Sequence, residues 1–114
     1  MNTNNLHFES LTPAVFYILL ALSRQDLHGY GIMKQVAEDS KGTIKMGPGT
    51  LYGTIQRMLK DNLIEEAETP KNEPERRRYY RITSRGRKVL SLELTRYESA
   101  VKVAKVLKLL PHKL

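Results

Sequence analysis

GPGTLYGTIQRMLKDNLIEEAE, residues 47–68, is the stretch that decides the fold, because it carries an amphipathic helix followed at once by a short strand. Pro48 suits the first turn of a helix, and Asn62 is an acceptable residue for its end. At about 100° per residue, four apolar side chains gather on one face of this helix: Leu51, Ile55, Met58 and Leu59. Leu63–Glu68 is then predicted to form a strand, so the helix leads directly into a sheet.

The opposite face of this helix carries no acidic side chain, and it consists of Thr50, Gly53, Gln56, Arg57 and Lys60. Arginine and glutamine can form paired hydrogen bonds with base edges, whereas threonine can bond a phosphate or touch a thymine methyl group. Gly53 lets the backbone approach closely, and the free N–H groups at the start of a helix attract phosphate. The face therefore suits a helix that enters the major groove of DNA. The alternative is an ordinary solvent-exposed face.

A hairpin is predicted after the helix. Pro70 and Pro74 cannot continue a ladder of hydrogen bonds, so residues 69–75 are expected to form a turn, and Arg76–Ile82 the return strand. Because alternate residues of a strand face opposite sides, Tyr80 is expected to point inward with Ile82. The other face would then hold Arg77, Tyr79 and Arg81. Cations close to the tip are candidates for phosphate contacts: Lys71, Arg76 and Arg77.

A groove-binding helix followed directly by a basic-tipped hairpin is the arrangement of a winged helix. The helix would occupy the major groove of DNA, and the hairpin would touch the backbone or the minor groove. For the hairpin alone the alternative is a charged edge strand, in which arginines block pairing with other sheets. The succession of the two elements favours DNA binding over either alternative.

The segment before this pair of elements predicts two further helices. Thr12 and Pro13 form a helix start, and apolar residues follow at the spacing of a buried helix face: Val15, Ile18, Leu19 and Leu22. The two glycines within residues 27–31 interrupt the pattern. A second helix is expected over about Tyr30–Asp39, with Ile32, Met33 and Val36 facing inward. Residues 1–10 are polar and expected to be flexible.

A long last helix is predicted over about Ser84–Leu109, capped by Thr83 and ended by Pro111. Its apolar residues follow the 4-3-4-3 spacing of a coiled-coil seam: Leu90, Leu94, Tyr97, Val101 and Ala104. Left unpaired, such a seam would expose an apolar patch that is uncommon on monomers. We therefore expect a homodimer that binds a pseudo-palindromic site with half-sites about one helical turn apart. The alternative is a helix that folds back on its own core.

These patterns predict a mainly α fold with a small β-hairpin. A winged helix-turn-helix domain would span residues 11–83, after a flexible N-terminus of residues 1–10, and a C-terminal dimerisation helix would span residues 84–114. The composition agrees with DNA as the partner, because the 114 residues carry a net charge of +7. Residues 76–88 alone contain seven basic residues and no acid.

Several other classes of protein are disfavoured by the sequence. It has no cysteine and no apolar run long enough to cross a membrane, so we expect a cytoplasmic protein without disulfides or a thiolate metal site. Its three histidines, His7, His28 and His112, stand far apart, and no cluster of acids or nucleophiles suggests catalysis. We expect neither an enzyme nor a bound metal or cofactor.

Five segments together resemble the PadR family of transcriptional regulators over residues 11–88. They are Leu11-Thr12-Pro13, His28-Gly29-Tyr30-Gly31-Ile32, Gly49-Thr50-Leu51-Tyr52, Asn62-Leu63-Ile64, and Arg76–Thr83 with Gly86. The resemblance implies a winged helix-turn-helix repressor that dimerises through its last helix, in the short form of the family that has a single such helix. The alternative is a winged helix that binds protein or RNA instead of an operator.

The resemblance also implies roles for particular residues. The segment Pro48, Gly49, Thr50, Leu51 and Tyr52 corresponds to the DNA-facing start of the recognition helix, and Tyr30 to a position of DNA contact, although Tyr30 could equally be a core residue. Lys34 on the second helix joins these candidates. Some members of the family hold a small-molecule effector between the subunits, in a pocket that can depend on a tryptophan of the last helix. This chain has no tryptophan, so Tyr97 or the pair Phe16 and Tyr17 would have to substitute.

Overall fold

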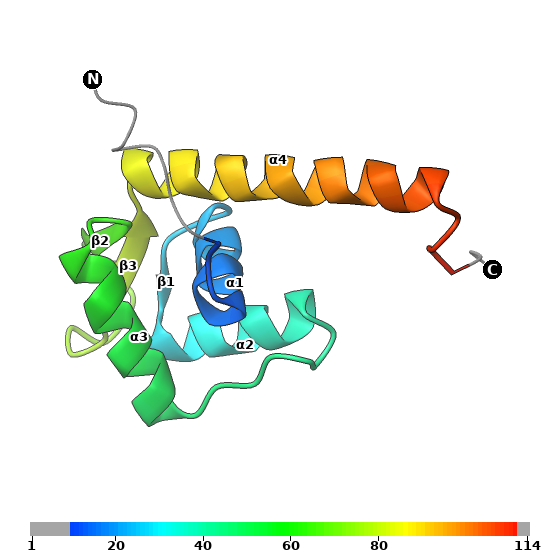
Figure 1. Ribbon diagram of the computed structural model, residues 1–114. Helices are drawn as coiled ribbons and strands as arrows, with labels where there is room; N and C mark the ends of the chain where they lie inside the picture. Colours follow the sequence, from blue (N-terminus) through cyan, green and yellow to red (C-terminus); the bar gives the residue numbers. More distant parts are fainter. Residues whose placement is uncertain (1–9, 112–114) are drawn as a thin grey trace, which may run out of the picture.

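The computed structural model describes residues 10–111, and the order of its elements is helix, strand, two helices, two strands and a long helix (Figure 1). The predicted flexibility of residues 1–9 lies outside the described residues. The elements are α1 (Pro13–Leu22), β1 (Leu27–His28), α2 (Gly29–Asp39), α3 (Pro48–Lys60), β2 (Ile64–Ala67), β3 (Tyr79–Ile82) and α4 (Ser84–Val106). Four helices with a small antiparallel sheet confirm the predicted fold class.

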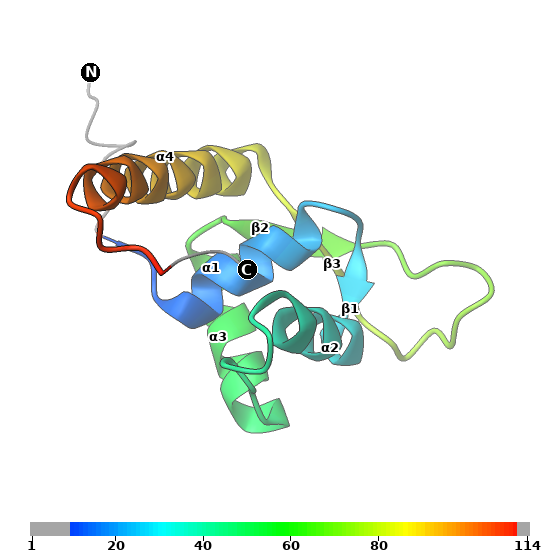
Figure 2. The ribbon, with the colours of Figure 1, turned by 90° about the vertical axis from the view of Figure 1, so that its right-hand side faces the viewer.

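Helix α1 lies at the centre of the molecule, between α4 on one side and α2 on the other (Figure 2). The Thr12 hydroxyl caps it by accepting the Val15 N–H at 3.2 Å, and Pro13 occupies its first turn as predicted. Its backbone lies close to α2, α3, α4 and β3. Ile18 and Leu19 are fully buried, and the core closes around them with residues of every other helix: Ile32, Val36, Leu51, Ile55, Met58, Val89 and Leu90.

The predicted hairpin is part of a three-stranded sheet in the order β1-β3-β2. Strand β1 was not predicted; it consists of two residues, and it pairs antiparallel with β3 through Leu27 opposite Tyr80 and His28 opposite Tyr79. With only two residues it shows no alternation that a sequence pattern could reveal. Its position makes β3 the central strand, so β3 has a neighbour on each edge.

The extra strand corrects the prediction for Tyr79, which was expected on the outer face with Arg77 and Arg81. Tyr79 is only 8% exposed, and Tyr80 is 3% exposed, so both tyrosines are buried. The ring of His28 on β1 packs edge-on against the Tyr79 ring, with 5.2 Å between ring centroids. The His28 side chain, which β1 carries, therefore covers a face that a two-stranded hairpin would have left open.

The strands and the last helix are shorter than predicted. Strand β2 spans Ile64–Ala67 instead of Leu63–Glu68, and β3 starts at Tyr79 instead of Arg76. Arg76 and Arg77 therefore lie in the loop of residues 68–78, which projects from the body in Figure 2. Helix α4 ends at Val106 rather than Leu109, because Lys108 adopts a left-handed backbone conformation (φ 58°) that ends the helix before Pro111 is reached.

Gly86 fixes the start of α4 against the sheet. A Cβ atom at this position would overlap the backbone carbonyl oxygen of Leu63, so only glycine allows this close approach. The Thr83 hydroxyl caps the helix by accepting the Gly86 N–H at 2.9 Å, and it donates to the Asn62 carbonyl at 2.7 Å. Asn62 itself ends α3 in the left-handed region (φ 61°), as its identity predicted. The end of α3 and the start of α4 are therefore tied together.

Candidate nucleic-acid interface

Helix α3 buries one face and exposes the other. Leu51, Ile55 and Met58 are at most 1% exposed, which agrees with the predicted inner face. The predicted DNA-facing residues of this helix are all exposed: Pro48, Gly49, Thr50, Tyr52, Gly53, Gln56, Arg57 and Lys60. No acid occurs in α3, so a surface of positive charge and neutral hydrogen-bonding groups faces solvent.

Tyr52 lies against the start of α2. A Cβ atom at Gly29 would overlap the Tyr52 hydroxyl and the adjacent ring carbon, so the phenol end of Tyr52 packs directly on the backbone of Gly29. Tyr52 is nevertheless 46% exposed. The two segments that carry these residues, HGYG and GTLY, are therefore in direct contact although they lie on different helices.

His28 holds the start of α2 and supports Tyr30. Its Nδ1 accepts the Gly31 N–H at 3.3 Å, so the imidazole is the N-cap of α2. The Tyr30 ring lies nearly parallel to the imidazole, with 6.4 Å between centroids, and is 65% exposed. Burial, followed by the nearby Arg77 charge, lowers the pKa of His28 below its ordinary value, which favours the neutral form that the cap requires. Tyr30 is thus an exposed residue on a fixed support and not a core tyrosine.

A polar cleft of about 310 Å³ joins α2, α3 and the loop between β2 and β3. Its lining residues are His28, Gly29, Tyr30, Tyr52, Arg76, Arg77 and Arg78. Four of the predicted DNA-binding residues thus meet in one place, while Gln56, Arg57 and Lys60 continue the exposed face along α3. Lys34 is exposed one turn beyond Tyr30, and Lys71 is exposed in the loop; neither lines the cleft.

Three residues of the cleft were not among the predicted contacts: His28, Gly29 and Arg78. The sequence signal for the first two was present, since they belong to the HGYG segment, but nothing in it indicated that Tyr52 would pack on them. Arg78 was missed because it was expected on the inward-facing side of a strand. The loop continues to Arg78, whose side chain is 70% exposed, so strand parity does not apply to it.

The positive charge of this region is smaller than the sequence suggests, because acids that are close in space pair with several arginines. Arg77 bonds Glu73 at 2.6 Å, Arg78 lies 3.5 Å from Glu66, and Arg81 lies 3.2 Å from Asp26. Arg76 makes no ion pair or hydrogen bond with any described residue and is exposed. Arg76 is therefore the cation of this loop that is best placed to neutralise a phosphate.

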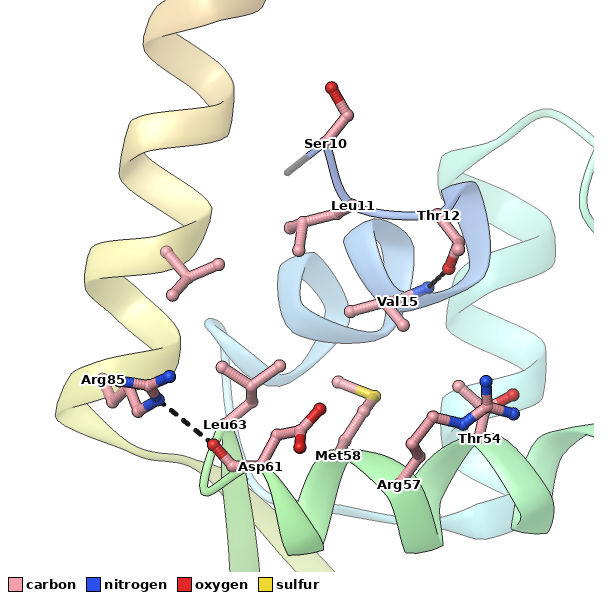
Figure 3. Close-up of a pocket in the computed structure, with 11 residues that line it drawn as sticks. Ser10, Leu11, Thr12, Val15, Thr54, Arg57, Met58, Asp61, Leu63 and Arg85 are labelled. Carbon is pink, nitrogen blue, oxygen red and sulfur yellow. Dashed lines mark hydrogen bonds between the residues drawn. The ribbon is translucent and has the colours of Figure 1, made fainter. Parts of the chain in front are cut away.

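Arg57 borders a second cleft, of about 260 Å³, between α3, the start of α1 and the start of α4 (Figure 3). Apolar side chains line its inner part: Leu11, Val15, Met58, Leu63 and Val89. Charged residues of α3 and α4 stand at its edge, where the Arg85 guanidinium donates to the Asp61 carbonyl at 3.1 Å. Arg57 lies at the boundary between this cleft and the exposed face of α3.

Helix α4 extends past the rest of the molecule (Figure 1), and its predicted seam divides into two parts. Leu90 is 6% exposed within the core of its own protomer, so it is not free to contact a second chain, contrary to the prediction. Leu94, Tyr97 and Val101 are each 41–42% exposed, and Ala104 is half-buried. The exposed seam therefore begins at Leu94.

Aromatic rings gather where α4 crosses α1. The Phe16 ring contacts Tyr17 and Tyr97, with 5.1 Å between centroids in each pair. Tyr97 and the Phe16/Tyr17 pair, the residues that could replace a missing tryptophan, therefore form one cluster. Among residues 10–111, no helix is long and apolar enough to cross a membrane, and no group of three or more acids and histidines could hold a metal ion.

Comparison with known proteins identifies the family. Residues 18–92 match the sequence model of the transcriptional regulator PadR-like family, which is more than half of the chain. The chain belongs to the PadR-like family. The match includes the HGYG and GTLY segments, the loop arginines and Gly86, so the residues that line the polar cleft lie within the family's shared region.

Three similar proteins extend the comparison. An uncharacterised protein of Lysinibacillus sphaericus is 33% identical over 85 residues, which cover 75% of this chain and 77% of that protein. A PadR family transcription regulator of Clostridium difficile has a similar structure, with a TM-score of 0.72 and 28% identity over 84% of this chain and 98% of its own. The structure of Bacillus subtilis PadR in complex with operator DNA shares the fold, with a TM-score of 0.64 and 19% identity, over 75% of this chain and 48% of its own.

Proposed function

We propose that this PadR-like regulator binds a pseudo-palindromic operator as a homodimer and represses transcription from it. The acid-free exposed face of α3 beside the arginine-lined cleft is the observation that carries the proposal. In each half-site, α3 enters the major groove, where Gln56 and Arg57 reach base edges. Bacillus subtilis PadR, a protein of the same fold, has been solved with its operator DNA, which supports duplex DNA as the partner.

The cleft is suited to the phosphate backbone on the edge of that groove. The exposed phenols of Tyr30 and Tyr52 line the cleft, and Arg76 offers an unpaired positive charge. Contacts of this kind position a protein on the duplex without reading its sequence. They also make affinity depend on salt, because each neutralised phosphate releases condensed counterions.

The homodimer is supported by the exposed apolar surface of α4. Leu94, Tyr97 and Val101 lie on one side of a helix that its own protomer covers only in part. A second copy packed on this side would remove them from water and would place the two α3 helices on one face of the duplex. A small-molecule effector that relieves DNA binding belongs to the proposal as well, and the cluster of Phe16, Tyr17 and Tyr97 beside this surface supports it.

The test is selection of bound fragments from genomic DNA, followed by titration of the best fragment in a mobility-shift assay. Arg57→Ala is expected to weaken specific binding by about 1–3 kcal/mol, the usual contribution of a base-edge contact, whereas Tyr52→Ala, which removes a contact with the backbone, should weaken binding to every fragment alike. Lys102→Ala is the matched control: it removes one exposed cation from α4, far from α3, and should bind as the unmodified chain does. A reporter gene behind the selected fragment then measures repression.

Two outcomes would contradict the proposal. Equal binding by all three variants would show that α3 does not read the DNA. Retention of RNA binding together with no affinity for duplex DNA would instead favour the adaptor that binds RNA or protein. A steep fall in affinity with added salt, combined with preference for a palindrome, is the expected pattern.

A further inference from the structure

Glu93, on α4, is the most buried charged side chain in the described part of the protein. It is 1% exposed, and no other ionised side chain among residues 10–111 is buried. A carboxylate removed from water is costly unless hydrogen bonds replace its hydration. The DNA interface proposed above does not include Glu93, so DNA binding does not explain why this carboxylate is buried.

Three hydrogen-bond donors replace the water that the buried carboxylate has lost, and they come from two distant parts of the chain. Its Oε2 accepts the Leu11 N–H at 2.9 Å and the Tyr97 hydroxyl at 3.1 Å, and its Oε1 accepts the Arg96 guanidinium at 2.8 Å. Burial by itself would raise the pKa of Glu93, but these hydrogen bonds outweigh it and hold the pKa below the ordinary value. The charged carboxylate therefore ties the segment that enters α1 to α4.

These hydrogen bonds lie at the point along α4 where the helix stops packing on the core of its own protomer. Val89 and Leu90, before Glu93, are buried in the core, whereas every residue from Leu94 to Val103 is exposed. The Phe16 and Tyr97 rings, 5.1 Å apart, make the neighbouring contact between α1 and α4. The direction of the free part of α4 is thus set by one polar cluster and one pair of rings.

A small change of direction at this point becomes large at the end of the helix. From Glu93 to Val106 the helix runs about 20 Å at 1.5 Å per residue. A rotation of about 10° at Glu93 would move that end by about 3.5 Å, close to the rise of about 3.4 Å per base pair of DNA. In a dimer joined through α4, the same rotation changes the separation of the two α3 helices.

The geometry points to Glu93 as a positioning residue that fixes the angle of α4 on the winged-helix body, and so selects the spacing of the two half-sites. This inference rests on the proposed function, because it requires a dimer that binds two half-sites. It is separate from base recognition, since Glu93 lies on α4 and lines neither the polar cleft nor the exposed face of α3.

The experiment measures affinity for a series of duplexes that carry the selected half-site twice and differ only in the spacing between the copies. The unmodified protein should prefer one spacing by tenfold or more over spacings that differ by one base pair. Glu93→Gln keeps the shape of the side chain but removes the charge and one acceptor, so this preference should fall to less than about threefold. Affinity for a duplex with a single half-site should stay unchanged. Glu98→Gln, which removes the same charge from an exposed position of α4, should keep the preference.

A distance measurement without DNA separates this inference from the proposed function. The chain has no cysteine, so Lys60→Cys gives one spin-label site in each α3. In the dimer, Glu93→Gln should broaden the distribution of distances between the two labels.

Absence of any measurable distance between labels in the otherwise unmodified chain would contradict the homodimer itself, and with it this role of Glu93. A dimer whose Glu93→Gln variant keeps both the distance distribution and the spacing preference would overturn the inference alone. So would an equal loss of affinity for single and double half-sites, because that pattern indicates general unfolding.

Discussion

Gly29 and Tyr52 constrain each other at the scale of single residues. The backbone of Gly29, in the first turn of α2, supports the phenol end of Tyr52, and this contact holds the ring at the edge of the polar cleft. The far end of an exposed tyrosine can swing away at small cost, whereas a backbone atom cannot. A side chain at Gly29 would therefore displace Tyr52 rather than unfold the protein.

Gly29→Ala should accordingly separate DNA binding from stability. We expect the midpoint of thermal unfolding to change little, because alanine is no worse than glycine within a helix. Affinity for operator DNA should fall about as much as in Tyr52→Ala. The double variant should bind no more weakly than either single variant, since both changes remove the same contact. Additive losses in a mobility-shift titration would show that Gly29 and Tyr52 act separately.

His28 provides a prediction on pH. Its pKa is lowered in the folded protein by burial and by Arg77, so below about 6.5, the ordinary value, the unfolded chain binds more protons than the folded one. The free energy of unfolding should therefore be constant above this pH and fall as the pH is lowered through it. This loss reports how strongly the folded protein favours the neutral imidazole. Denaturation by urea at pH 5.0–7.5 measures it.

His28→Asn is the control for this prediction, because asparagine can cap a helix but does not titrate in this range. The variant should lack the part of the pH dependence that begins near pH 6.5. It should keep the fall at more acidic pH that comes from Asp39 and Glu93, whose lowered pKa values make the folded state lose stability when they are protonated. Identical profiles for both proteins would contradict the role of His28.

At the scale of elements, helices were predictable and the sheet was less so. The caps at Thr12 and Thr83 and the end at Asn62 depend on one or two neighbouring residues, and all three were found where the sequence placed them. Strand β1 depends on pairing between Leu27 and Tyr80, 53 positions apart, and no local pattern reveals it. The burial of Tyr79 follows from that pairing. For the same reason, the contact of Gly29 with Tyr52 became visible only in the structure.

The loop between β2 and β3 shows a similar limit for charge. Its sequence predicts a cluster of free cations, but acids that are close in space pair with two of them: Glu73, within the loop, pairs with Arg77, and Glu66, on β2, pairs with Arg78. Exposed pairs of this kind contribute little to stability. They do reduce the number of charges available to DNA.

The cations of this loop should therefore differ in their effect on DNA binding. Arg76→Ala should reduce the dependence of log affinity on log salt concentration by about one unit, as expected for one lost phosphate contact. Arg77→Ala should reduce it by less, because Glu73 already lies 2.6 Å from its guanidinium. Glu73→Gln should strengthen binding at low salt by releasing Arg77. Equal slopes for Arg76→Ala and Arg77→Ala, measured from 50 to about 200 mM salt, would show that the ion pair opens on DNA.

At the scale of the whole molecule, α4 has a buried part and an exposed part, although its sequence pattern predicted a single seam. The seam from Leu90 to Ala104 has a uniform spacing, yet Leu90 belongs to the protomer's own core, and the exposed part begins at Leu94. Periodicity identifies the apolar side of a helix but not what covers each part of it. Glu93 lies between the part of the helix that is buried in the core and the exposed part that we propose contacts a second copy.

Substitutions in the exposed part of the seam should change the oligomeric state of the protein. Leu94→Asp or Val101→Asp should produce monomers, because a carboxylate buried at a two-fold interface would meet its own copy without a compensating cation. Thr95→Asp places the same charge one residue away on the polar side of α4 and should leave the dimer intact. Sedimentation velocity distinguishes the two masses, and single half-site binding tests whether each winged helix is still folded.

An unchanged mass for both Leu94→Asp and Val101→Asp would place the interface elsewhere. Monomers that still bind a single half-site, but have lost the preference for a palindrome, would show that α4 supplies the pairing of the half-sites and α3 the reading of each one.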